Sequence, residues 1–403
     1  MSEIDRVLIA GAGPVGQVAA GLLQLEGVPV TILEREAQLP EDLRAGTFHP
    51  PSLELMEPLG FTDYLMREGI RVPHWQFRDL HDGLVAEFDL GVLKGDTAYP
   101  FRLHCEQWKL TFEAARLLKK RPGVEFRFGH EVTGVRQDAD KVTVTCRTAE
   151  GEREVSGRWL VGADGGRSVV RKTGGFTFEG FTWDELFVVV STPYDFGPHG
   201  FTENAYIADP DLWCAVFKMP GFARGQPLWR FAYGADPSET DDEVLAPAEI
   251  ERVLQSFLPK PEGYDISHKS AYRVHQRVVD TFRKGRVLLA GDAAHINNPM
   301  GALGMNSGLQ DAANLAEKLA KVWKREAGPE LLDRYDRQRR AIANEIVQTM
   351  STGNLKRLKE RDPKVRKAAR AEMRRICEDP KRHREYMLQT SMIASMRRAE
   401  AIA

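Results

Sequence analysis

The sequence predicts a mixed fold, α/β plus α+β, and three observations support this. Apolar runs at residues 6–10, 158–162 and 286–290 each lead into a glycine-rich turn, as in a parallel sheet. Two other segments alternate apolar and polar residues with turn signals, as antiparallel strands do. The chain from about residue 330 has helical spacing. We expect a discontinuous nucleotide-binding domain (1–73, 104–183 and 270–329), an inserted antiparallel-sheet substrate domain (74–103 and 184–269) and a C-terminal helical segment (330–403).

The first apolar run opens a dinucleotide-binding unit. It leads into Gly11-Ala12-Gly13-Pro14-Val15-Gly16, a helical pattern follows to about Glu26, and a second strand-like run over 28–33 ends at Glu34. In this GxGxxG loop the first glycine allows a tight turn, the second admits a pyrophosphate and the third lets helix and strand pack closely. The first helical turn supplies free N–H groups and a positive dipole for the phosphates. A Rossmann-like sheet is therefore predicted.

Carboxylates at strand ends indicate which dinucleotide is bound. Glu34, followed by Arg35, lies where a carboxylate accepts hydrogen bonds from an adenosine ribose. Residues 162–168 (GADGGRS) supply Asp164 and Gly165, and Asp292 follows the third run. Parallel strands end together on the ligand side of a sheet, and a long polyol phosphate uses several carboxylates there better than NAD does. FAD, with its ribityl chain, is the expected cofactor.

Composition and charge exclude other classes of protein. The 58 acidic and 56 basic residues nearly cancel, which argues against nucleic acid or an acidic membrane as the partner. No apolar run approaches the roughly 18 residues of a membrane span. The chain begins without a cleavable leader pattern, and its four cysteines form no CxxC pair. We expect a cytoplasmic protein with reduced thiols and no metal site.

Three motifs in order resemble those of a known family. GxGxxG, GADGGRS and the segment 291–315, with the pattern GDAAH…PxGxxGxNxGxxDAxNL, are similar to those of the para-hydroxybenzoate hydroxylase family of single-component FAD monooxygenases. The resemblance covers most of residues 4–325. It implies non-covalent FAD, with Asp292 on the ribityl chain and Asp164 and its glycines near the pyrophosphate and the nicotinamide path. It also implies that Arg44 reaches toward the FAD and that Gln107 lies near the flavin side chain.

The resemblance further implies that the flavin ring lies against residues 299–306. Gly301 and Gly304 remove side chains where a flat ring touches the backbone. A helix is predicted to start near Asn306, so that N–H groups of this turn, Met305 included, face the flavin edge that becomes negative on reduction. The resemblance places the Pro299 carbonyl beside the substrate and makes Pro299 and Gly304 the catalytic candidates. Asn298 replaces the first proline of the family pattern, which puts the local pocket shape in question, and His295 is predicted to be structural.

The predicted antiparallel sheet carries several aromatic residues that could form the walls of a substrate pocket. Most are expected to be core, while a few are expected to contact an aromatic substrate. Arg230 is expected to be a solvated strand charge rather than a partner for a substrate carboxylate. The C-terminal helices are expected to pack over the FAD domain or to form a homodimer seam. The aromatic candidates are Tyr206, Trp213, Phe217, Trp229, Phe231 and Tyr233.

The implied reaction is aromatic hydroxylation. NADH or NADPH would reduce the FAD, O2 would add at flavin C4a, and the resulting hydroperoxide would attack an electron-rich ring of a phenolic or hydroxypyridine type. The substrate is expected to be activated by deprotonation, but neither His49 nor His104 can be assigned as the base. Glu36, Glu41 and Asp42 would repel a 2′-phosphate, which gives a weak preference for NADH.

Two other readings stay open from the sequence. The same fold could catalyse another redox reaction, such as alkene reduction or epoxidation. The WxWxIP signature linked to flavin halogenases is absent. The chain could instead be a non-catalytic flavin-binding sensor, which ligand-stimulated NADH oxidation would distinguish from an enzyme.

Overall fold

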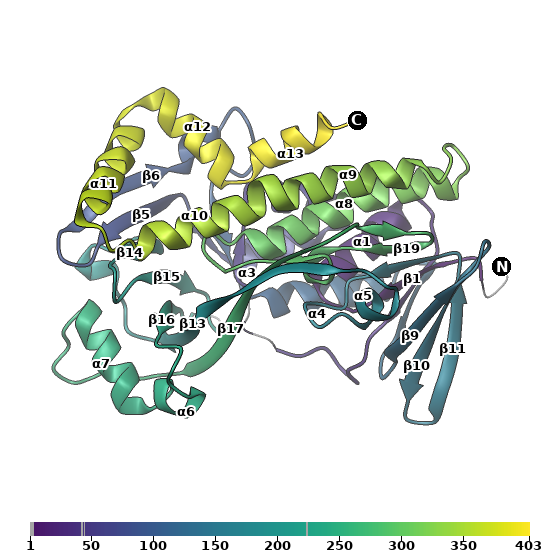
Figure 1. Cartoon of the computed structure of the whole chain (residues 1–403), viewed down its shortest axis with the longest axis horizontal. Helices are drawn as coiled ribbons and strands as arrows, with labels where there is room; N and C mark the ends of the chain where they lie inside the picture. Colours follow the sequence, from purple (N-terminus) through teal and green to yellow (C-terminus); the bar gives the residue numbers. More distant parts are fainter. Residues whose placement is uncertain (1–3, 42, 44, 223–224) are drawn as a thin grey trace.

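The computed structural model describes residues 4–41, 43, 45–222 and 225–403. Two large sheets lie beneath a layer of long C-terminal helices that crosses both of them (Figure 1). None of the helices in the described ranges has the length and apolar character needed to cross a membrane. The predicted α/β plus α+β fold is confirmed.

The first large sheet is parallel except at one edge. Its strands follow the order β18-β19-β12-β1-β2-β8, and β18 alone is antiparallel to its neighbour. Their bounds are β18 Arg283–Lys284, β19 Val287–Leu289, β12 Trp159–Gly162, β1 Val7–Ala10, β2 Val30–Leu33 and β8 Val124–Arg127. The pairing aligns Ala10 with Leu33 and Gly162, and Gly162 with Leu289, so four strands end in one row.

Helices cover this sheet because its strands are apolar on both faces. α1 packs against both α4 and α8, and residues of these helices share one buried core with the strands. The helices of this region are α1 Pro14–Leu25, α2 Pro50–Met56, α3 Phe61–Glu68, α4 Gln107–Leu118 and α5 Val169–Thr173. Two small sheets flank it: β9 Glu131–Gln137, β10 Val142–Thr148 and β11 Gly151–Gly157, and β3 Thr47–Phe48, β7 Arg102–His104 and β4 Ile70–Val72.

The second large sheet has eight strands, antiparallel except where β14 pairs with β5. One face packs on α6 (Asp241–Val244) and α7 (Pro247–Phe257), and the other faces the C-terminal helices. In spatial order the strands are β20 His295–Ile296, β17 His268–Val279, β13 Phe178–Thr192, β16 Leu228–Ala235, β15 Cys214–Met219, β14 Asn204–Ala208, β5 His74–Asp79 and β6 Gly83–Asp89. The expected domain boundaries at 183/184 and 269/270 fall inside β13 and β17, so continuous strands join the two parts of the chain.

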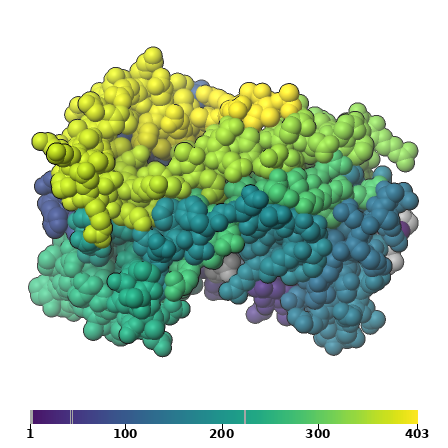
Figure 2. Space-filling model, in the orientation of Figure 1, coloured from purple at the N-terminus to yellow at the C-terminus, as the bar shows by residue number. Residues whose placement is uncertain are grey.

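The C-terminal helices form the third layer. They occupy the upper part of the face seen in Figure 2, in lime to yellow, above the teal and green segments. Their bounds are α8 Leu303–Trp323, α9 Leu331–Ile342, a π-helical turn Ala343–Gln348, α10 Thr349–Leu358, α11 Pro363–Glu378, α12 Pro380–Thr390 and α13 Ile393–Glu400. Short 3-10 turns occur at Glu57–Leu59, Leu90–Leu93, Gly197–His199 and Gly291–Ala293.

One predicted helix boundary is wrong. α8 begins at Leu303 rather than near Asn306. Gly301 and Ala302 have φ of 99° and 57°, and these left-handed residues make the turn that precedes the helix. Gly304, whose residue type is unfavourable inside a helix, nevertheless lies within the first turn of α8.

Candidate cofactor and substrate site

The glycine loop after β1 is shaped by two close backbone contacts and one open position. A Cβ on Gly11, whose φ is 101°, would lie 2.5 Å from the Ala163 carbonyl oxygen, and a Cβ on Gly16 would lie 2.1 Å from the Gly11 oxygen. A Cβ on Gly13 would meet no atom within 4 Å. Pro14 opens α1, whose first intrahelical bond runs from the Gln17 N–H to the Gly13 carbonyl. Thus Gly11 and Gly16 serve packing, whereas Gly13 leaves space in front of the helix N-terminus.

Val15 and Glu34 connect this loop to neighbouring segments. Val15 fills the space above Gly291 and Gly308, where added Cβ atoms would lie 2.9 and 2.7 Å from its Cγ2. The half-buried Glu34 carboxylate accepts the Ala12 N–H at 2.8 Å and the Glu36 N–H at 3.0 Å. Each carboxylate oxygen has further lone pairs, so hydrogen bonds to ribose hydroxyls remain available.

The second glycine cluster holds a carboxylate that folds back on its own chain. Asp164 accepts hydrogen bonds from the Ser168 hydroxyl at 2.5 Å and the Val169 N–H at 2.8 Å, at the start of α5. Burial raises the pKa of Asp164, and these hydrogen bonds oppose the rise. The adjacent Gly165 has φ of 76° and open space where a Cβ would be. Asp164 therefore shapes the loop, and Gly165 leaves its surface clear.

The loop that follows β19 brings a third carboxylate to the same row. Gly291 has φ of 63°, and Asp292 is exposed directly after it. Farther along, the Pro299 carbonyl accepts the Ala302 N–H at 3.0 Å, which closes the turn before α8. A Cβ on Gly301 would lie 2.9 Å from the Asn354 amide nitrogen, and one on Gly304 would lie 3.1 Å from the Asn297 Oδ1.

Asn306 ties the first turn of α8 to the segment before α2. Its amide donates to the carbonyls of Thr47 and Ala302 and accepts from the His49 N–H and the Ser52 hydroxyl, at 2.6 to 2.8 Å. The side chain is buried and its four hydrogen bonds lie within the protein. Only the backbone of this residue is therefore open to a cofactor, and Met305 beside it packs partly on the core.

Gln107 and Arg44 are the candidates expected near the flavin, and the structure describes Gln107. Gln107 is the first residue of α4, and its N–H donates to the Ala45 carbonyl at 3.0 Å. Arg35, another predicted cofactor residue, is exposed and pairs with Glu36 at 2.9 Å. Arg44 lies outside the described residues.

These residues fit an extended dinucleotide. Open backbone at Gly13 and Gly165, the N-terminus of α1, the half-buried Glu34 and the exposed Asp292 all lie beyond the carboxyl ends of aligned parallel strands. That row offers amide donors for phosphates and carboxylates for hydroxyls, which is the donor and acceptor set FAD requires.

A buried ionic network supports residues 290–302 between β19 and α8, called the flavin loop here because their motif is expected to hold the flavin ring. His295 Nε2 lies 2.8 Å from Asp311 Oδ2, and Arg339 Nε donates to Asp311 Oδ1 at 2.5 Å. Asp311 also accepts the Gly291 N–H at 3.0 Å. Burial disfavours the charge on Asp311, but Arg339 and His295 outweigh it and lower its pKa to about 2. The contact of His295 with Asp311 is structural. Together with the Arg339 and Gly291 contacts of Asp311, it links α8 and α9 to the loop after β19.

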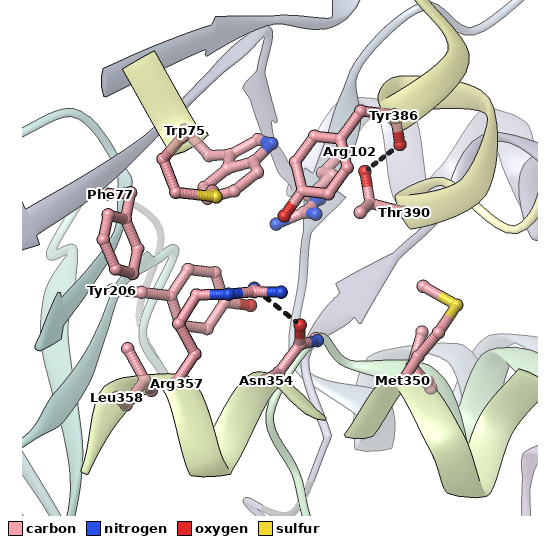
Figure 3. A pocket seen from close by; sticks show the side chains of 13 residues that line it. Trp75, Phe77, Arg102, Tyr206, Met350, Asn354, Arg357, Leu358, Tyr386 and Thr390 are labelled. Atoms are coloured by element: carbon pink, nitrogen blue, oxygen red, sulfur yellow. Dashed lines mark hydrogen bonds between the residues drawn. The ribbon is translucent and has the colours of Figure 1, made fainter. Parts of the chain in front are cut away.

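A cavity adjoins the flavin loop on the side of the C-terminal helices. The side chains around it enclose about 440 Å³, part of it open to solvent, and Gly301 and Leu303 form one border. Figure 3 shows aromatic side chains from the sheet facing polar ones from α10 and α12. The lining residues are Trp75, Phe77, Arg102, Tyr206, Gly301, Leu303, Met350, Asn354, Arg357, Leu358, Met373, Tyr386 and Thr390.

The prediction that most of the aromatic residues on this sheet are core is confirmed. Of the six candidates, Tyr206 lines the cavity. Trp229, Phe231 and Tyr233 belong to the core beneath α7, and Trp213 packs against Phe187. Because the strands alternate, residues 229, 231 and 233 share the face opposite the cavity.

Other cavity residues were not named as candidates, although Trp75 and Phe77 lie in the predicted substrate domain, within 74–103. Trp75 and Phe77 share one face of β5, which their spacing by two could have indicated. Arg357 and Tyr386 come from the C-terminal helices, which the sequence placed over the FAD domain or at a dimer seam. No local motif marks them. Arg230, expected to be solvated, is buried.

Comparisons with known proteins agree with this site. A family model described as an FAD binding domain matches residues 5–350. Para-nitrophenol 4-monooxygenase of Pseudomonas sp. (strain WBC-3) is 37% identical over 91% of this chain and 90% of its own. 6-Hydroxy-3-succinoylpyridine 3-monooxygenase of Pseudomonas putida (strain DSM 28022 / S16) is 33% identical over 90% and 91%.

A solved structure extends the similarity to three dimensions. The crystal structure of p-nitrophenol 4-monooxygenase from Pseudomonas putida DLL-E4 has a TM-score of 0.91 and 35% identity, and the match covers 98% of both chains. The resemblance inferred from the motifs is confirmed. The chain belongs to the FAD-binding family of flavoprotein aromatic hydroxylases.

Proposed function

We propose that this protein is an FAD-dependent monooxygenase that uses NAD(P)H and O2 to hydroxylate a small phenolic or hydroxypyridine-type substrate. One observation carries the proposal: Gly301 and Leu303, at the start of α8, border an aromatic-lined cavity. The same turn belongs to the motif expected to hold the flavin ring. A ring bound in the cavity would therefore lie next to the cofactor.

The protein's own residues position and stabilise the bound cofactor. Gly11, Gly13, Gly16 and the first turn of α1 would hold the pyrophosphate, with Pro14 and Val15 setting the helix start. The N–H groups at the start of α8, including those of Gly304, Met305 and Asn306, would face the flavin edge that gains charge. Bound FAD supplies the electron transfer and oxygen activation.

The remaining assigned residues complete this proposed site. Glu34 and the neighbouring Arg35 would hold the ribose end, and Asp292 the ribityl chain. Asp164 and Gly165 would border the pyrophosphate, with Gln107 and Arg44 near the flavin. Pro299 would place its carbonyl beside the substrate, and Gly304 would let the ring approach the backbone. Besides orienting the rings, this enclosure would exclude water.

NADH is the proposed electron donor. Glu36 and Glu41 are exposed beyond the ribose-binding position, and their charges would repel the 2′-phosphate of NADPH, although Arg35 pairs with Glu36. We expect a higher kcat/KM with NADH than with NADPH in steady-state assays. A lower KM for NADPH would contradict this preference.

A substrate panel tests the hydroxylase proposal. Nitrophenols, hydroxybenzoates, phenylpropionates and hydroxypyridines would be scored with the yellow holoprotein for stimulated NADH oxidation, with product mass after reaction under ¹⁸O2. A hydroxylase incorporates one labelled oxygen atom. Stimulated oxidation without incorporation would favour another redox reaction on the same fold. Flavin reduction that no ligand accelerates would favour a non-catalytic flavin-binding sensor.

The domain division, the cytoplasmic location and a homodimer stay predictions from the sequence. Limited proteolysis tests the first, fractionation of cells the second and light scattering of the purified protein the third. The absence of nucleic acid and membrane partners is likewise an expectation from the near-balanced charge.

A further inference from the structure

The cavity beside the flavin loop is lined with cations and hydrogen-bond donors. Two arginines, Arg102 from β7 and Arg357 from α10, line it together with Trp75, Tyr206 and Tyr386. Among the described residues that line this cavity there is no aspartate, glutamate or histidine. A bound group would therefore meet positive charge that no lining carboxylate offsets.

Three of the lining residues carry buried polar atoms that have no hydrogen-bond partner among the described residues. These atoms are Trp75 Nε1, Tyr206 OH and Arg102 Nε, on residues only 4%, 7% and 2% exposed. Arg102 is fixed by a hydrogen bond to Asn204 Oδ1 at 2.6 Å and lies 5.3 Å from the Trp75 ring centroid. Because buried donors are normally satisfied, these atoms point to a ligand rich in acceptors.

Arg357 is connected to the flavin loop through Asn354. It donates to the Asn354 side-chain oxygen at 3.3 Å, and the amide nitrogen of Asn354 donates to the Met300 carbonyl at 3.4 Å. Figure 3 shows the Arg357 guanidinium extending from α10 across the cavity, near Tyr206. The loop that borders the cofactor site therefore also orients this charge.

The groups near the cavity are poor candidates for a base. His49 and His104 bond the carbonyls of Gly301 and Lys218, at 2.9 and 3.0 Å, and burial together with Arg102 lowers the pKa of each to about 3. His383 lies behind Phe88, where it accepts the Asp89 N–H, and burial lowers its pKa. Burial raises the pKa of Tyr386 despite Arg357 and Arg102.

We propose that the cavity binds its aromatic substrate as an anion, with Arg102 and Arg357 stabilising the charge, and that no protein base removes the substrate proton. The proposal rests on the hydroxylase function and narrows its substrate class. The preferred substrates are acidic phenols and hydroxypyridines, which carry an electron-withdrawing substituent and are ionised near neutral pH. The proton leaves to solvent before binding, and the arginines favour the ionised form.

The pH dependence of a substrate series is the first test. With para-substituted phenols whose pKa values span about 7 to 10, kcat/KM should rise with pH, with a midpoint that follows each phenol's own pKa. One midpoint shared by every phenol would identify a protein base and overturn the proposal while leaving the hydroxylase function intact. The absence of any stimulated oxidation would instead overturn the function.

A binding measurement tests the proposal even without turnover. 4-Nitrophenol titrated into the holoprotein should develop its phenolate absorption band at a pH below its solution pKa. 4-Nitroanisole, which cannot ionise, should bind more weakly than the phenolate. Equal binding of the two ligands, or binding of nitrophenol in its neutral form, would overturn the proposal.

Substitutions at Arg357 test whether this arginine stabilises the bound phenolate. Arg357→Gln should raise the KM or Kd for the phenolate by roughly 10- to 100-fold, the range of one charge-assisted hydrogen bond, and should raise the pKa of bound nitrophenol. Arg357→Lys should restore part of the affinity. Arg361→Gln is the matched control, because Arg361 is exposed and pairs with Asp211 on the surface at 2.9 Å. An effect equal to that of the control would overturn the role of Arg357.

Tyr206→Phe separates anion binding from a proton relay. We expect a several-fold rise in KM and an unchanged midpoint in the pH dependence of kcat/KM, because the hydroxyl only donates a hydrogen bond. A midpoint that moves, or activity lost only with phenols that are un-ionised at the assay pH, would show that Tyr206 carries the proton.

Discussion

The C-terminal helices are attached to the rest of the molecule in two different ways. α9 is joined to α8 through Arg339 and Asp311, both fully buried. α12 and α13 are joined to the segment after β6 through Arg384 and Arg397, whose half-exposed guanidinium groups share Asp96. The first attachment stands behind the flavin loop, and the second holds α12, which lines the cavity, together with the adjoining α13.

This difference suits the two ligands. A resident cofactor needs a loop of fixed geometry, and a buried ionic network is costly to break once one partner is removed. A substrate must enter and its product must leave, and ion pairs with exposed partners contribute little stability. The fold is therefore expected to be rigid around the flavin and loosely fastened around the cavity.

The largest expected effect is at the buried attachment. Asp311→Asn would leave Arg339 and His295 without their carboxylate, and we expect a loss of about 3–5 kcal/mol in the free energy of unfolding. Chemical denaturation of the apoprotein measures this change. A loss below about 1 kcal/mol would contradict the proposed difference between the two attachments.

The pH dependence of stability gives a second measure of the same network. The Asp311 pKa lies at about 2, below the unfolded value near 3.9, so its contribution is complete above about pH 4. The contribution is lost as the pH falls from there through about 2. The Asp311→Asn variant should lack this portion of the acid-induced loss of stability.

Substitutions at Gly11 and Gly13 distinguish a role in folding from a role in cofactor binding. Gly11→Ala places a Cβ at positive φ and 2.5 Å from a backbone oxygen, so we expect a loss on the order of 2 kcal/mol in stability. Gly13→Ala brings its Cβ within 4 Å of no described atom beyond its chain neighbours, so the apoprotein should keep its melting temperature but bind FAD more weakly. Absorbance at about 450 nm after reconstitution measures the bound flavin. Equal destabilisation by both substitutions would refute this division.

The sequence predicted the cofactor side better than the cavity side for a physical reason. A phosphate-binding turn needs an open glycine such as Gly13 and packing glycines such as Gly11 and Gly16 at fixed spacing after a strand, so the requirement is visible locally. The cavity wall combines Trp75, Arg102 and Arg357 from distant segments, and packing alone brings them together. Buried side chains such as Asp311 resemble ordinary helix charges until their partners are known.

The start of α8 shows the same limit at one element. The glycines of 301–304 indicated a loop, but the sequence did not reveal which glycine lies in the turn and which in the helix. Gly301 has φ of 99°, whereas Gly304 is helical and lies beside Asn297. Gly301 is buried and Gly304 is partly exposed, so the two glycines that the sequence treated alike have different surroundings.

The smallest expected effect is at the exposed attachment. Arg397 and Arg384 hold the pKa of Asp96 below its usual value, so the pairs stabilise the fold above the unfolded pKa, and this contribution is lost as the pH falls below that value through the lowered pKa. Asp96→Asn should cost no more than about 1 kcal/mol. It should nevertheless increase hydrogen exchange in α12 and α13, because Arg384 and Arg397 then lose the carboxylate that joins these helices to the segment after β6.

Salt sharpens this last prediction. Raising the ionic strength from about 0.05 to 0.5 M should increase exchange in α12 and α13 of the unmodified protein, and should change the Asp96→Asn variant less, since screening acts on the pairs that the variant lacks. Exchange in α9 should be insensitive to salt in both proteins because Asp311 and Arg339 are shielded from solvent. Equal salt responses of α9 and α12 would mean that the two attachments do not differ, and substrate would then need another route into the cavity.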